Sequence, residues 1–313
     1  MSKGLVDYQD GEHIDQNVLI RDADIRTAKN GKPFIALIFS DSSGQIKGKL
    51  WGAKPEDIAQ FTKGAIVHLK GLRETYQTTP QVRIDKMTVS VDQDISVDDL
   101  VPHAPVDKSD LEAQLNQYLL EITEAKWNRI VRWLLTKTEG KFFDYPAAKS
   151  NHHAYAGGLA YHTVSMLKLA AAISQEYPQI NQALLYAGTI LHDLGKVVEL
   201  TGPETTTYTL SGNLIGHIVL VDEAIVEACA ALNFALTDEK IILLRHMVLA
   251  HHGQLEFGSP VRPKLLEAEV LHQIDEMDAS LTMISTALAH TNPGQYTPRL
   301  FALEQRQFYK PKL

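Results

Sequence analysis

The first third of the chain alternates apolar and polar residues, a pattern typical of half-buried β-strands. In residues 46–51 every second side chain, beginning with Ile46, is expected to face inward. The intervening Lys47, Lys49 and Trp51 are then expected to face outward. This pattern predicts strands at residues 18–26, 33–39, 45–51, 66–73 and 81–89.

Turn-forming residues separate the expected strands. The strongest hairpin signals are Lys-Asn-Gly-Lys at 29–32 and Asp-Ser-Ser-Gly at 41–44. Residues 55–61, between the third and fourth strands, suit one short helix. Three strands, a helix and two strands follow one another in the OB-fold, a small Greek-key barrel that often binds single-stranded nucleic acid. We therefore expect an OB-fold over residues 1–95.

Apolar residues recur at three- and four-residue spacing from residue 110 onward, which predicts amphipathic helices. The stretch before them is polar and acidic and contains Pro102 and Pro105. We interpret residues 96–109 as a linker. The expected helices cover residues 111–122, 127–137, 158–177, 181–195, 214–232, 238–252 and 264–290. The predicted fold class is therefore multidomain, a β-barrel followed by an all-α bundle over residues 110–313.

Two glycines mark the ends of expected helices. Gly195 closes the segment 181–195, and Gly253 follows the segment 238–252. A helix often ends in a left-handed residue, which favours glycine. Both glycines are therefore expected to be left-handed caps.

Composition limits the classes of function. The 313 residues are 44% hydrophobic and 22% charged, as in an ordinary globular protein. The net charge of −8 argues against an indiscriminate nucleic-acid binder but leaves room for a locally basic groove. The single cysteine, Cys229, cannot form an internal disulfide, which fits a reducing cytoplasm. No apolar run is long enough to span a bilayer, and no signal peptide is visible, so we expect a cytoplasmic protein without a membrane partner.

The outward face of the expected barrel combines cations with aromatic rings. Bases stack on such rings and phosphates pair with such cations. Alternatively, Trp51 and Tyr76 could cover the ends of the barrel, and the lysines could simply be solvated. The residues expected to bind a single strand are Arg26, Lys32, Lys47, Lys49, Trp51, Arg73 and Tyr76.

Histidine and aspartate are concentrated in the second half of the chain, where ten of the thirteen histidines lie between residues 152 and 290. Imidazole and carboxylate without cysteine form the ligand set for Mn²⁺, Fe²⁺, Zn²⁺ or Mg²⁺. One such histidine alone is more often structural. Several on inward faces of different helices are not explained that way, and bundle cores are where metal sites assemble. The candidate ligands are His162, His192, Asp193, His217, His251, His252 and Asp275.

The order His162, His192-Asp193, Asp275 resembles the signature of the HD superfamily of metal-dependent phosphohydrolases. The further His217 and the pair His251-His252 resemble its two-metal members. Together with an OB-fold in front, the chain resembles the YhaM-type 3′–5′ exoribonucleases over nearly its full length. This resemblance implies removal of nucleotides from the 3′ ends of single strands with two divalent ions, Mn²⁺ favoured over Fe²⁺, Zn²⁺, Mg²⁺ or Co²⁺.

The resemblance also implies which residues hold each ion. The first ion would take His162, His192, Asp193 and Asp275. The second ion would share Asp193 and take His217, with His251 and His252 as alternatives for its remaining position. Two ions about 3.5–4 Å apart polarise the phosphate and activate a water for in-line attack.

Three further residues are candidates near this site. Lys196 is expected either to neutralise charge on the phosphoryl oxygens or to complement a helix dipole. Asp278 either orients a ligand histidine or is an ordinary exposed helix acid. His153, and with it His152, could bind substrate phosphate from the preceding loop. We accordingly list Asp193, Lys196 and Asp278 as catalytic candidates.

Three functions remain open on the sequence. The first is a 3′–5′ exoribonuclease, in which the barrel holds the strand and the helical domain cleaves it. The second is a phosphohydrolase of dNTPs or cyclic nucleotides, and the third is a non-catalytic nucleic-acid-binding protein with a structural metal site. The complete ligand set argues against the third, because a structural site needs fewer ligands and no open position. Single-stranded RNA is the expected partner; single-stranded DNA and a homo-oligomeric state stay open.

Overall fold

The computed structural model describes residues 3–28, 31–76, 79–92, 94–149 and 153–313. The chain divides into two compact units. One comprises Met1–His103 with Pro203–Thr206, and the other Ala104–Gly202 with Thr207–Leu313. Among the described residues, no helix has the length and apolar character needed to cross a bilayer.

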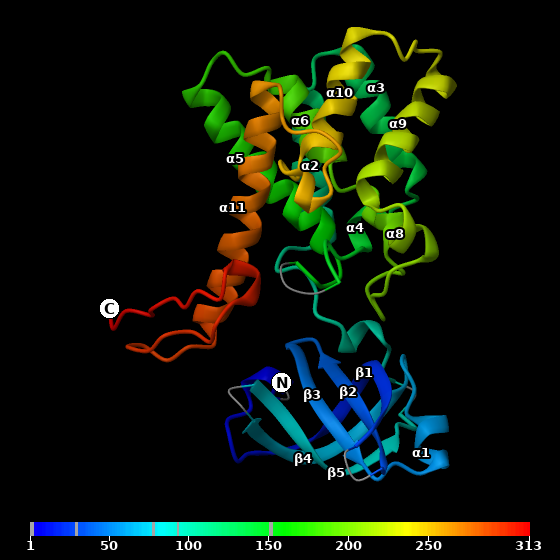
Figure 1. Cartoon of the computed structure of the whole chain (residues 1–313), viewed down its shortest axis with the longest axis vertical. Coiled ribbons are helices and arrows are strands. Elements are labelled where there is room, and N and C mark those ends of the chain that lie inside the picture. Colours follow the sequence, from blue (N-terminus) through cyan, green and yellow to red (C-terminus); the bar gives the residue numbers. More distant parts are fainter. Residues whose placement is uncertain (1–2, 29–30, 77–78, 93, 150–152) are drawn as a thin grey trace. The chain divides into compact units, whose positions relative to one another are not determined.

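The first unit is a closed β-barrel (Figure 1). Its strands are β1 (His13–Thr27), β2 (Pro33–Asp41), β3 (Gly44–Trp51), β4 (Ile66–Tyr76) and β5 (Thr79–Val89), with the short helix α1 (Pro55–Gln60) between β3 and β4. Neighbouring strands follow the order β1-β2-β3-β5-β4, and the parallel pairing of β3 with β5 closes the barrel. This is the expected OB-fold.

Strand β3 confirms the predicted alternation. Ile46 and Gly48 are buried, whereas Lys47, Lys49 and Trp51 are exposed. A glycine is needed at position 48 because a Cβ there would lie 2.8 Å from the ring of Phe39. The two faces of β3 therefore have separate roles, one in the core and one on the surface.

The segment after β5 is more ordered than the expected linker. Asp98–Leu100 form a 3-10 turn, η2. Leu100 and Val101 are buried, and the Ser40 hydroxyl donates a hydrogen bond of 2.8 Å to the Leu100 carbonyl. These residues pack as part of the barrel unit because apolar side chains in an otherwise polar stretch are stabilised by leaving water.

The second unit is all-helical (Figure 1). Its helices are α2 (Lys108–Glu121), α3 (Ala125–Lys137), α4 (Lys141–Asp144), α5 (Gly158–Glu176), α6 (Gln182–Leu191), α7 (Lys196–Glu199), α8 (Leu210–Leu214), α9 (His217–Leu232), α10 (Glu239–Ala250) and α11 (Leu266–Ala289). Helix α6 is buried from Ala183 to Leu191 and contacts α3, α5, α10 and α11. The near absence of polar residues in α6 is thus explained by its central place in the bundle.

The expected helix 181–195 is shorter in the structure, and the expectation for Gly195 was wrong. Helix α6 ends at Leu191, and Gly195 has a φ of −61°, so it is not a left-handed cap. A Cβ on Gly195 would lie 2.4 Å from the carbonyl oxygen of His217. Glycine is needed there so that the start of α9 can approach the end of α6. Gly253, with a φ of +74°, does have the expected left-handed conformation.

Candidate metal centre and nucleic-acid interface

The candidate ligands converge because several helices end or begin at one place in the bundle. His192 caps the C-terminus of α6, and Asp193 follows it in a turn. His251 caps the C-terminus of α10, and His217 is the first residue of α9. The remaining ligands lie on or directly after helices: His162 early in α5, His252 after α10 and Asp275 on α11.

The Asp193 carboxylate lies at the centre of this cluster. Its Oδ2 is 3.3 Å from His192 Nε2 and 3.8 Å from His162 Nε2. Its Oδ1 is 3.3 Å from His217 Nε2 and 3.8 Å from His251 Nε2. Each oxygen therefore faces a different pair of imidazoles, as a carboxylate shared by two ions would.

The other ligands complete two groups around Asp193. His162, His192 and Asp193 can each supply one ligand atom, with these atoms all within 4.8 Å of one another. Asp275 Oδ1 lies 3.2 Å from His162 Nε2, on the side of this first group. A second group, with ligand atoms equally close, is formed by His217, His251 and His252.

Each of the five histidines has a hydrogen-bond partner at Nδ1. Where the partner is an acceptor without a proton, Nδ1 must be the donor, so Nε2 carries the lone pair that a metal needs. The acceptors are the carbonyl oxygens of Thr189 for His192 (2.8 Å), Val248 for His251 (2.7 Å) and Phe257 for His252 (2.6 Å), and the carboxylates of Glu199 for His217 (3.0 Å) and Asp278 for His162 (2.7 Å). The backbone and two acids thus orient the ligand rings.

Several atoms that face the centre of the cluster are buried and lack a hydrogen bond. Within the part of the chain that the structure describes, these include Nε2 of His192, His217 and His251 and Oδ1 of Asp193. Buried polar atoms without a partner are rare in proteins and usually indicate an ion or a water. Divalent cations at these atoms would satisfy them, so the residues present fit a metal site.

The protonation states suit cation binding. Burial raises the pKa of Asp193, but the Lys196 ammonium and the His192 ring outweigh burial and hold this pKa well below its ordinary value. Burial also lowers the pKa of His251 well below its ordinary value and lowers that of His252. At His162 burial lowers the pKa, but hydrogen bonds to carboxylates raise it to about 9, so a cation binding there must displace a proton. The site therefore combines an ionised carboxylate with imidazoles at His251 and His252 that favour the neutral form.

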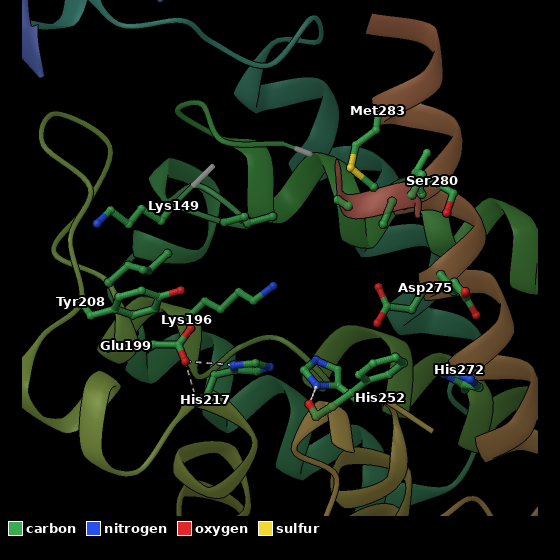
Figure 2. A pocket seen from close by; sticks show the side chains of 18 residues that line it. Lys149, Lys196, Glu199, Tyr208, His217, His252, His272, Asp275, Ser280 and Met283 are labelled. Atoms are coloured by element: carbon green, nitrogen blue, oxygen red, sulfur yellow. Dashed lines mark hydrogen bonds and ion pairs between the residues drawn. The ribbon is translucent and has the colours of Figure 1, made fainter. Parts of the chain in front are cut away.

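Lys196 lies beside the central carboxylate. Its Nζ donates a hydrogen bond of 2.6 Å to Asp193 Oδ2, and burial, which lowers its pKa, is outweighed by Asp193. Figure 2 shows its side chain extending into the pocket towards Asp275. Lys196 is the first residue of the four-residue helix α7, and its ammonium is engaged by the Asp193 carboxylate.

Asp278 and His153 lie behind the ligands. Asp278 is 7% exposed, and its Oδ2 accepts hydrogen bonds from His162 Nδ1 and from His153 Nε2 (2.8 Å). It is therefore not an exposed helix acid, and its hydrogen bond fixes the ring of the candidate ligand His162. His153 is 2% exposed, and its Nδ1 lies 2.7 Å from the Tyr155 hydroxyl. This placement contradicts the expected phosphate contact of His153; His152 lies outside the described residues.

Three of the candidate ligands, His217, His252 and Asp275, line a pocket of about 600 Å³ (Figure 2). Sequence reasoning missed four residues of its lining: Lys149, Glu199, Tyr208 and His272. Glu199 had a usable signal, because it is an acid six residues beyond the His192-Asp193 pair. His272 Nδ1 lies 3.1 Å from the His251 carbonyl oxygen, so this ring also contacts the backbone at the end of α10.

The barrel carries an exposed aromatic group of its own. Trp51 and Tyr76 are 61% and 55% exposed, and Lys49 Nζ lies 5.6 Å and 5.8 Å from their ring centroids. The Phe34 ring lies 4.6 Å from that of Trp51. These residues, with the exposed Lys47, form one surface of cations and rings around β3. We call this group, Phe34, Lys47, Lys49, Trp51 and Tyr76, the aromatic face.

The other residues expected to bind a single strand, Arg26, Lys32 and Arg73, are not part of the aromatic face. Arg26 is exposed but pairs with Asp24 at 2.8 Å, and Lys32 is exposed. The Arg73 side chain is only 15% exposed and is bound to Asp10 and to the Thr75 hydroxyl. The expectation for Arg73 was therefore wrong, because its guanidinium is engaged within the barrel.

Comparison with known proteins gives the same division. Residues 159–280 match the HD domain family, and residues 19–90 match the OB-fold nucleic acid binding domain family. The chain is 45% identical over 312 residues to the 3′–5′ exoribonuclease YhaM of Listeria monocytogenes, covering 99% of each chain. It is 44% identical over the same length to the 3′–5′ exoribonuclease YhaM of Listeria welshimeri, again covering 99% of each. The chain therefore belongs to the YhaM family of 3′–5′ exoribonucleases.

Proposed function

We propose that this chain removes nucleotides one after another from the 3′ end of single-stranded RNA by metal-dependent phosphodiester hydrolysis. The observation that carries the proposal is Asp193, a buried carboxylate whose two oxygens face different pairs of imidazole Nε2 atoms. That arrangement, together with the kinship to the YhaM exoribonucleases, favours a two-ion hydrolase over a structural metal site.

The ligands divide into two sets. His162, His192, Asp193 and Asp275 would hold one ion. Asp193 would also serve the second, with His217, His251 and His252 grouped around it. Divalent ions held in this way polarise a phosphodiester and activate water for attack on phosphorus. Mn²⁺ is our favoured ion because the resemblance to the exoribonuclease family implies it; His/Asp ligation without cysteine by itself also accepts Fe²⁺, Zn²⁺, Mg²⁺ and Co²⁺.

Other residues of the pocket act on the substrate or on the ligands. Lys196 extends its ammonium into the pocket, where it would stabilise negative charge on the non-bridging phosphoryl oxygens. Asp278 holds the His162 ring with Nε2 turned towards Asp193 and Asp275. Glu199 does the same for His217 by accepting the hydrogen bond from its Nδ1.

The barrel would hold the strand while the helical unit cleaves it. The aromatic face offers exposed rings for stacking and ammonium groups for phosphates, which suits single strands of either sugar. Because no residue is identified that reads a 2′-hydroxyl, single-stranded DNA is a second substrate to be compared directly with RNA.

The deciding experiment uses purified full-length protein, Mn²⁺ and a 5′-labelled single-stranded RNA. A ladder that shortens from the 3′ end supports the proposal. Hydrolysis of dNTPs or cyclic nucleotides beside intact RNA would instead identify a small-molecule phosphohydrolase. An RNA with the same sequence but a 3′-terminal phosphate, a 5′-labelled DNA and a duplex with a blunt 3′ end serve as matched substrates for end chemistry, sugar and strandedness.

A further inference from the structure

The pocket above the metal ligands has a side wall to which the catalytic proposal assigns no role. Tyr208 and Lys149 form this wall, and Met283 and Ser280 of α11 lie on the opposite side of the pocket (Figure 2). Lys196 lies between the two sides, and Asp275 lies on α11 with Met283 and Ser280. A molecule with its phosphate at Lys196 would therefore have the Tyr208 ring within the same pocket.

The backbone fixes the Tyr208 ring relative to the metal ligands. Leu200 and Tyr208 form an antiparallel bridge, and the Thr209 amide donates a hydrogen bond of 2.9 Å to the Glu199 carbonyl. Glu199 in turn accepts hydrogen bonds of 3.0 Å from both the amide and the Nδ1 of His217. A short two-stranded ribbon thus connects the ring to a ligand histidine, which makes Tyr208 a rigid part of the site.

Tyr208 has the features of a stacking platform. It is 45% exposed although it lines the pocket, so part of its surface remains available. Lys149 Nζ lies 6.0 Å from the centroid of the ring, and no carboxylate among the described residues is within ion-pair distance of it. The apolar Ala147 and Ala148 line the pocket beside them. A ring, a neighbouring cation and a small apolar surface are what proteins use to hold a base and its adjoining phosphate without reading sequence.

We propose that Tyr208 and Lys149 form a subsite for the 3′ end of the strand: the terminal base stacks on Tyr208, and Lys149 binds the next backbone phosphate on the 5′ side of the scissile one. This inference rests on the proposed exonuclease function. It predicts a preference for substrates that carry a base over phosphate esters without one, because only a substrate with a base can contact both Lys196 and the Tyr208 ring. It also predicts little base preference, since every base has a face that can stack.

The test removes the Tyr208 ring and the terminal base separately and together, and asks whether the effect of one depends on the other. Tyr208→Ala, Tyr208→Phe and the wild type are compared on two RNAs that differ only in a 3′-terminal abasic residue. With the intact base, Tyr208→Ala should lower kcat/KM about tenfold, the effect of losing one stacked base, and Tyr208→Phe should stay near wild type. On the abasic strand Tyr208→Ala should differ from wild type by less than about twofold. Tyr177→Ala, which removes an exposed tyrosine just beyond the end of α5, is the matched control.

The outcomes separate the subsite from the exonuclease activity. If Tyr208→Ala lowers kcat/KM equally on both strands, the ring has a structural role and the subsite is refuted. If wild type degrades RNA but shows no difference between the two strands, the subsite fails while the exonuclease function stands. If wild type leaves both RNAs intact, the proposed function itself fails.

The phosphate half of the subsite has a separate readout. Lys149→Ala should raise KM for RNA about three- to tenfold at low salt, with kcat unchanged, and the difference should shrink as salt is added because counterions screen the contact. Lys168→Ala, on the exposed side of α5, is the matched removal of a surface charge. An unchanged KM, or a rise equal to that of Lys168→Ala, would overturn the assignment of Lys149.

Discussion

The barrel presents its polar chemistry on the surface, whereas the helical unit buries it. Trp51 and Tyr76 are 61% and 55% exposed, while His162 and His192 are 0% and Asp193 is 3% exposed. An exposed ring loses only its own contact with a ligand when it is replaced. A buried polar group is held by several partners, and its removal leaves each of them without compensation. Replacing one side chain should therefore weaken RNA binding moderately when it lies in the barrel, and should reduce metal binding and turnover much more strongly when it lies in the metal centre.

The largest expected effect is that of Asp193→Ala. Because this carboxylate faces four ligand histidines, its loss should remove bound metal and lower kcat on single-stranded RNA by at least about a thousandfold. RNA binding through the barrel should stay within about threefold of wild type, since its contacts are unchanged. Metal analysis, turnover and binding anisotropy measure the three quantities. Asp193→Asn keeps the shape and controls for packing. Equal losses of binding and turnover would contradict the division between the two units.

Removal of divalent ions is expected to destabilise the helical unit and to leave the stability of the barrel unchanged. A ligand present at 100 times its Kd stabilises the folded state by about 2.7 kcal/mol. For a helical unit of this size, chelation should lower the midpoint of unfolding by about 5–10 °C. Amide hydrogen exchange of the full-length chain should become faster in α6 and α10 and stay the same in β1–β5. Faster exchange throughout the barrel would show that the two units are not independent in stability.

Asp278→Asn is expected to lower metal affinity by a smaller factor, because Asp278 acts only through its hydrogen bond to His162. His153 and His162 both donate to the same carboxylate oxygen, and the neutral amide oxygen that replaces it is a weaker acceptor without the negative charge beside His162. Metal affinity should fall about 10- to 100-fold, as is usual for the loss of an orienting partner. RNA binding should not change. Titration with Mn²⁺ checks the affinity, and Glu269→Gln on the exposed side of α11 is the matched control. An affinity equal to that of wild type would show that His162 needs no orienting acid.

The smallest expected effect belongs to the aromatic face. Trp51→Ala should weaken binding of single-stranded RNA about tenfold, because one stacked base is lost, and should leave kcat on a dinucleotide unchanged. Trp51→Phe should restore most of the affinity. Lys49→Ala should weaken binding more than Lys86→Ala, which removes another exposed lysine of the same barrel. A loss of turnover on the dinucleotide would assign the aromatic face a role in cleavage and remove the contrast between the units.

Much of the fold follows from local sequence patterns. The alternation around Ile46 and Gly48 specifies which face of β3 is buried, and a one-residue shift of register would reverse it. The apolar spacing of the second half likewise indicates helices. The helix ends were harder to predict. Gly195 looked like a left-handed cap, but it is required by the approach of His217 from a distant helix.

The sequence predicted the candidate metal ligands, but it did not predict the groups that hydrogen-bond to them. Residue type indicates that His162 and Asp193 can bind metal, and the order of the motif suggests that they do so together. The Nδ1 acceptors could not be predicted, since most are backbone carbonyls, which are the same at every residue. The contact between His153 and Asp278 could not be predicted either, because it depends on how the loop that carries His153 packs against α11.

The sequence by itself determined a barrel followed by a helical bundle and a set of imidazoles and carboxylates for divalent ions, because side-chain period and residue chemistry are local properties. Only the tertiary structure decided which of these groups meet, which nitrogen of each ring faces the centre, and that Tyr208 and Lys149 share the pocket with Lys196. The physical reason is that hydrogen-bond direction and burial depend on residues far away in the chain, and neighbouring sequence carries little information about them.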